Sequence, residues 1–72
     1  MKTIKRGDVT MIGLAWKAID ILSYGILNQN KDQIREAYAI VEAKDFDWEV
    51  VPDFVFNRWD EQTDKANEIL MS

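Results

Sequence analysis

Residues 9–28, VTMIGLAWKAIDILSYGILN, form the longest apolar stretch of the chain. Its polar or small positions recur at steps of three and four residues, so they share one narrow stripe of a helix: Thr10, Gly13, Lys17, Asp20 and Tyr24. Asp8 precedes the stretch, and its carboxylate can accept the unbonded amides of a helix start. The sequence therefore predicts a helix at about residues 9–28, capped by Asp8 and apolar around most of its circumference.

A second helix is predicted at about residues 31–44. Asn-Gln-Asn at 28–30 interrupts the apolar stretch, and Asn30 with Gln33 three residues later resembles a capping box. Apolar side chains then follow at the spacing of one helix face, namely Ile34, Ala37, Tyr38 and Val41. Because the intervening loop is short, we expect the first two helices to pack as an antiparallel hairpin.

Residues 45–56 leave two structures open. Phe46, Trp48 and Val50 alternate with acidic residues at the period of a strand, which is compatible with a short β-hairpin at 46–56. A lone two-stranded hairpin is marginally stable, however, and Pro52 equally suits the first turn of a helix. We therefore favour a loop followed by a third helix at about 53–70. The predicted fold is a small all-α three-helix domain spanning residues 1–72.

The small size of the chain raises the question of what completes its core. A chain of 72 residues buries only about 60% of the surface that it exposes on unfolding, and it contains neither Cys nor His. The first helix offers two apolar faces, and one includes small residues that allow close approach of another helix. We expect a homodimer, a dimeric helical bundle, formed through that face: Met11, Leu14, Ala18, Ile21 and Gly25. In the alternative, the other two helices cover both faces within a monomer.

Charge is distributed unevenly along the chain. Residues 1–41 carry six Lys or Arg against four Asp or Glu, whereas residues 42–72 carry three against nine. The acidic half predicts a second interaction, in which a helix face binds or inhibits a basic protein partner: Trp59, Asp60, Glu61, Asp64 and Glu68. A solvated helix face with no partner would show the same composition.

Catalysis and cofactor binding are not expected. Without His or Cys no nucleophile and base can be paired, and the carboxylates show no metal-binding spacing. An EF-hand loop beginning at Asp45, for example, would need Gly and Glu where Val50 and Phe56 stand. The sequence therefore favours a non-catalytic protein–protein interaction module, a small regulatory protein with neither cofactor nor metal.

Membrane and nucleic-acid partners are also disfavoured. Lys17 and Asp20 lie in the middle of the apolar stretch, where a bilayer would penalise both charges. The alternative function is a small helix-turn-helix-like DNA-binding regulator, but the second helix offers only Lys31 and Arg35 to an anionic groove. The N-terminus has no apolar segment typical of a signal peptide, so we expect a cytoplasmic protein.

Overall fold

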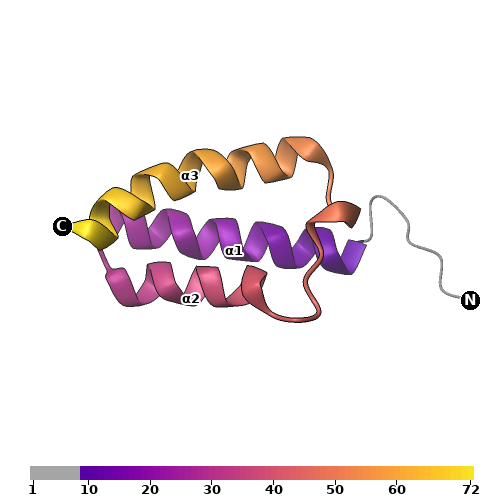
Figure 1. Ribbon diagram of the computed structural model, residues 1–72, viewed down its shortest axis with the longest axis horizontal. Coiled ribbons are helices and arrows are strands. Elements are labelled where there is room, and N and C mark those ends of the chain that lie inside the picture. The colour runs from indigo at the N-terminus through magenta and orange to yellow at the C-terminus, as the bar shows by residue number, and fades with distance from the viewer. Residues whose placement is uncertain (1–8) are drawn as a thin grey trace, which may run out of the picture.

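The computed structural model describes residues 9–72 and confirms the all-α three-helix fold. The helices are α1 (Val9–Asn28), α2 (Lys31–Glu42) and α3 (Asp53–Met71), with a short 3₁₀ helix, η1 (Trp48–Val50), between α2 and α3. Successive helices run antiparallel, and α1 lies between α2 and α3 (Figure 1). The predicted N-cap, Asp8, lies outside the described residues.

The α1–α2 turn is closed by main-chain hydrogen bonds. Gln29 adopts a left-handed conformation with φ of 53°, and its amide donates to the carbonyl of Ile26 at 3.2 Å. The Asn30 amide donates to the Gly25 carbonyl at 2.8 Å, which completes a Schellman-type helix end. The Asn30 side chain then accepts from the Gln33 amide at 3.2 Å, so the predicted cap of α2 is confirmed.

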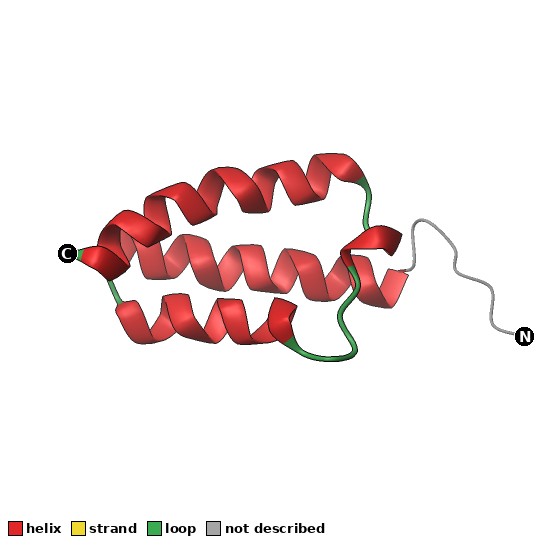
Figure 2. Cartoon of the chain, in the orientation of Figure 1, coloured by secondary structure: helices red, strands yellow, loops and turns green. Residues whose placement is uncertain are grey.

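Helix α2 ends two residues before the predicted boundary. Ala43 leaves the helical conformation with ψ of 148°, and its carbonyl accepts from the Phe46 amide at 3.0 Å. The next segment contains no strand, so the β-hairpin alternative is wrong for this part of the described chain (Figure 2). Asp47 instead starts η1, because its carboxylate accepts from the Glu49 amide at 2.9 Å.

Aromatic rings explain the alternation that resembled a strand. The ring of Trp48 packs edge-on against Phe46 and Phe56, with centroid separations of 4.8 and 5.1 Å. The same indole lies 5.9 Å from the ring of Trp59 on α3. These contacts fix the α2–α3 connection to α3 through side-chain packing, without main-chain pairing between strands.

The core lies along the inner face of α1. Its buried apolar residues come from all three helices and from the connection before α3: Ala15, Ala18, Ile19, Leu22, Ile34, Ala37, Val50, Val51, Val55, Trp59 and Ala66. Helix α1 packs against both neighbours, whereas α2 and α3 touch each other little. Tyr38 on α2 joins them by donating to Asn67 Oδ1 at 2.9 Å and packing its ring against Trp59.

Candidate protein-interaction surfaces

The small-residue face of α1 is used inside the chain. Ala18 and Gly25, two of the residues predicted to mediate self-association, are buried. A Cβ added at Gly25 would lie 2.8 Å from Ile34 Cγ1 and 3.0 Å from the Ile34 amide nitrogen on α2. At Gly25 the close approach therefore serves the α1–α2 hairpin, and Ala18 is buried within the chain, which corrects the expectation that both lie between chains.

The other three predicted residues of that face, Met11, Leu14 and Ile21, are half-buried along the flanks of α1. Met11 and Ile21 pack against the buried core. Helices α2 and α3 together thus bury much of the apolar surface of α1. Any contact made by α1 with another molecule must involve the remaining part of its surface.

That remaining part is a band of exposed residues, here named the outer stripe of α1: Thr10, Gly13, Trp16, Lys17, Asp20, Tyr24 and Leu27. It includes large apolar side chains, since Trp16 is 40% exposed, Tyr24 58% and Leu27 77%. The polar stripe was evident from the sequence, but the exposure of Trp16 beside it was not. Leu27 lies in the last turn of α1, and no pattern in the sequence indicated that its side chain is exposed.

The outer stripe carries two unlike charges at its centre. Lys17 and Asp20 are both exposed and stand three residues apart. Within residues 9–72 the structure contains one ion pair, between Arg35 and Asp32 on α2, at 3.4 Å. Both central charges of the outer stripe therefore remain available to a partner.

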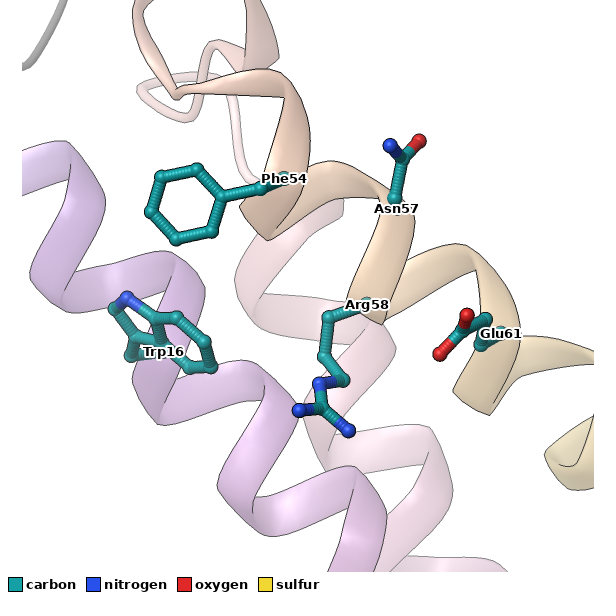
Figure 3. A pocket seen from close by; sticks show the side chains of 5 residues that line it. All are labelled: Trp16, Phe54, Asn57, Arg58 and Glu61. Carbon is teal, nitrogen blue, oxygen red and sulfur yellow. The ribbon is translucent and has the colours of Figure 1, made fainter.

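A shallow hollow of about 370 Å³ adjoins the outer stripe between α1 and α3. It is lined by Trp16 from α1 and by four residues from α3: Phe54, Asn57, Arg58 and Glu61 (Figure 3). The rings of Trp16 and Phe54 lie on one side of the hollow, and the Arg58 side chain extends toward α1. Because Phe54 is 68% exposed, the hollow extends the apolar part of the outer stripe onto α3.

The acidic residues predicted on the third helix do share an exposed face. Asp60, Glu61, Asp64 and Glu68 are all exposed, and none forms an ion pair with another residue of the described chain. Their positions, at steps of one, three and four residues, make one band along α3, here named the acidic face. The acidic face is therefore free to meet a cationic surface.

Trp59 does not belong to this face. Its side chain is only 7% exposed and packs between Tyr38 and Trp48, with ring centroids at 5.7 and 5.9 Å. The prediction that Trp59 contacts a partner is corrected, because the ring turns toward the core on the opposite side of α3 from the carboxylates. Phe54, five residues earlier on the helix and 68% exposed, is an aromatic surface residue that sequence reasoning missed.

No polar or charged side chain among residues 9–72 is buried, and no three Asp or Glu side chains there gather closely enough to hold a metal ion. Tyr38 has a perturbed pKa, which burial raises and the nearby Glu42 carboxylate raises further. By length and composition, residues Thr10–Asn28 of α1 also meet the requirements of a membrane span, as the core helix of a soluble protein can.

No family model, curated protein or solved structure matches the chain. Functional inference therefore depends on the surfaces themselves. Two stand out among the described residues: the outer stripe of α1 with its adjoining hollow, and the acidic face of α3.

Proposed function

We propose that the chain is a non-catalytic protein–protein interaction module that self-associates through the outer stripe of α1. One observation carries the proposal: Trp16, Tyr24 and Leu27 leave large apolar surfaces exposed along a single helix. Contiguous exposed apolar surface is typical of interaction sites, and a second copy of the same chain is the commonest partner of a soluble protein. A small domain also gains the most from burying such a surface.

The test compares two exposed apolar residues near the same end of the molecule. Leu27 lies in the last turn of α1 and Met71 ends α3, and they are 77% and 87% exposed. Leu27→Lys places a charge in the outer stripe and should shift the solution mass from dimer to monomer in light scattering at micromolar concentration. Met71→Lys adds the same charge outside the stripe and should leave the mass unchanged. A native chain that stays monomeric at every concentration would refute self-association.

A second candidate function is the binding or inhibition of a basic protein by the acidic face of α3. Its support is the set of four exposed, unpaired carboxylates on one side of a helix. Such a surface attracts cationic surfaces over a distance and speeds encounter with them, an effect that salt screens. A partner normally held by nucleic acid would present the required cluster of Lys and Arg.

A synthetic arginine-rich peptide provides a defined probe for this second function. Neutralising the acidic face with Asp60→Asn, Glu61→Gln, Asp64→Asn and Glu68→Gln should weaken binding at low salt at least about tenfold. The control neutralises four exposed carboxylates elsewhere, at Glu36, Glu42, Asp45 and Glu49, and changes the net charge equally. Equal weakening in both variants would show a general charge effect and would reject the acidic face as the site.

The DNA-binding alternative has less support. A helix-turn-helix motif crosses its two helices at about 90–120°, whereas α1 and α2 run antiparallel along each other (Figure 1). On α2, Arg35 is engaged by Asp32 at 3.4 Å, and Lys31 donates to the main-chain oxygen of Ser72 at 2.7 Å. Neither cation is therefore directed freely toward phosphate.

A further inference from the structure

The outer stripe of α1 is complementary to a second copy of itself that runs in the opposite direction. Gly13, Lys17, Asp20, Tyr24 and Leu27 follow one another at alternating steps of four and three residues. This is the seam of a heptad pattern, in which two helices meet along one line. The two charges stand at the centre of the seam, with a glycine on one side and a large aromatic residue on the other.

We propose that two copies of the chain pack their outer stripes antiparallel, about a two-fold axis that passes between Lys17 and Asp20. In this register Lys17 faces the partner subunit's Asp20, and Gly13 faces the partner subunit's Tyr24. The proposal depends on the self-association proposed above and adds its orientation and register. Helices α2 and α3 of each monomer keep the packing against α1 that they have in the isolated chain.

Charge decides the direction of the two helices. A parallel pair would place Lys17 against Lys17 and Asp20 against Asp20 at the centre of the interface, which like-charge repulsion disfavours. The antiparallel pair forms two equivalent ion pairs instead, because the two-fold axis repeats each contact. Charged residues at seam positions add little net affinity after desolvation, but they specify orientation and register.

Size complementarity selects the same register. A Cβ added at Gly13 would meet no heavy atom within 4 Å, so the space beside this glycine is open. Tyr24 is 58% exposed and supplies a ring large enough to occupy that space. The symmetry places this pairing on both sides of the central charges. The small position and the large one therefore match as the two unlike charges do.

The dimensions of the contact indicate a weak dimer. Twenty residues of α1 give a seam of about 30 Å, and Trp16 widens it on the side of Phe54. A contact made by one helix from each subunit buries about 1,000 Å² in total, which is near the lower end of the areas found for specific interfaces. We expect a dissociation constant in the micromolar range.

Charge reversal tests the register directly. Lys17→Asp and Asp20→Lys each replace two attractive pairs by two repulsive ones, so each should raise the dimer dissociation constant at least about tenfold. The double variant restores opposite charges across the axis and should recover the native constant in sedimentation equilibrium. Arg35→Asp and Asp32→Lys make the same changes of net charge on exposed positions of α2, and they should leave dimerisation unchanged.

Cysteine crosslinking supplies an independent readout, because the chain contains no Cys. Mixed Gly13→Cys and Tyr24→Cys chains should form a disulfide with each other under mild oxidation. Gly13→Cys alone should crosslink poorly, since the proposed register separates the two copies of position 13 by about 16 Å along the helices. Circular dichroism at 222 nm verifies that every variant remains helical.

The outcomes separate this inference from the function on which it depends. A native dimer without rescue in the double variant, or with efficient crosslinking of Gly13→Cys to itself, would overturn the antiparallel register and leave self-association standing. A native chain that is monomeric throughout would overturn both. Rescue together with the mixed crosslink would support the proposed dimer.

Discussion

The two sides of α1 pack against the rest of the chain in different ways. Toward α2 the contact is close, because Gly25 lies directly beside Ile34. Toward α3 the contact involves large rings, in which Trp59 is buried while Phe54 stays 68% exposed beside a hollow. The α2 side of α1 has no room for an added methyl group at Gly25, whereas the α3 side leaves open space at its outer edge.

This difference indicates which positions of the domain can be substituted without disturbing its internal packing. Helix α2 is held against α1 by the steric fit at Gly25 and the turn at Gln29, and its first turn is capped by Asn30, so changes at these three positions disturb the fold. Helix α3 is fixed mainly along its inner face, and its outer face can change without loss of packing. Both proposed surfaces are consistent with this division, since neither includes a residue that is buried within the chain.

Removal of the Trp59 ring should have the largest effect. The Trp59→Ala variant loses a side chain that is only 7% exposed and its contacts with Tyr38 and Trp48, so we expect a loss of about 3–5 kcal/mol in the free energy of unfolding. Urea unfolding followed by circular dichroism measures it. Phe54→Ala is the control, because that ring is largely exposed and its removal should cost less than about 1 kcal/mol. Equal costs would contradict the assignment of Trp59 to the core.

The fit between α1 and α2 is tested by a matched pair of glycine substitutions. Gly25→Ala places a Cβ 2.8 Å from Ile34 Cγ1, and we expect a net loss of about 1–2 kcal/mol even though alanine favours helix. Gly13→Ala meets open space and should gain about 0.5–1 kcal/mol. Thermal unfolding at concentrations below dimerisation compares the two. A stabilising Gly25→Ala would show that the α1–α2 contact is looser than the structure has it.

The start of α2 is capped by one side chain, whereas α3 begins after Pro52, at Asp53, without a side-chain cap. Asn30→Ala removes the acceptor of the Gln33 amide, and it should lower the free energy of unfolding by about 1 kcal/mol. Asn28→Ala, at an exposed position two residues earlier, should change it by less than about 0.5 kcal/mol. Urea midpoints of the two variants give the comparison, and indistinguishable values would argue against the cap.

The helices could be predicted from the sequence because their signals are local. An apolar stretch of 20 residues, the polar tripeptide at 28–30 and Pro52 gave the boundaries of α1 and α3 to within one residue. Residues 45–56 were ambiguous since alternating rings suit either a strand or a cluster. Only the packing of Trp48 against Phe56, eight residues away in the sequence, distinguishes the two.

The surfaces were harder to predict than the fold. Periodicity placed the four carboxylates on one face, but it could not show that Trp59 turns to the core, because the position of its neighbours Tyr38 and Trp48 depends on tertiary structure. Small size likewise marks Ala18 and Gly25 as positions of close approach without specifying the approaching helix. That α2 of the same chain fills this role follows only from three-dimensional packing.

The contact of Tyr38 on α2 with α3 gives the smallest expected effect on stability, and this effect depends on pH. Burial raises the pKa of the Tyr38 phenol above its ordinary value of 10.0, and the Glu42 carboxylate raises it further. The unfolded chain therefore loses this proton at a lower pH than the folded chain does. The associated stability is fully present below pH 10 and is lost as the pH rises through the folded-state pKa.

Urea midpoints measured between pH 8 and pH 11 should accordingly fall more steeply for the native chain than for Tyr38→Phe, which has no ionisable phenol. At pH 8 the variant should be slightly less stable, because it also loses the hydrogen bond to Asn67 Oδ1 at 2.9 Å. The two curves should approach each other at high pH, where the native phenol is ionised in both states. Parallel curves would mean that the Tyr38 phenol is as well solvated in the folded chain as in the unfolded chain. The contact between α2 and α3 at Tyr38 would then not bury its hydroxyl group.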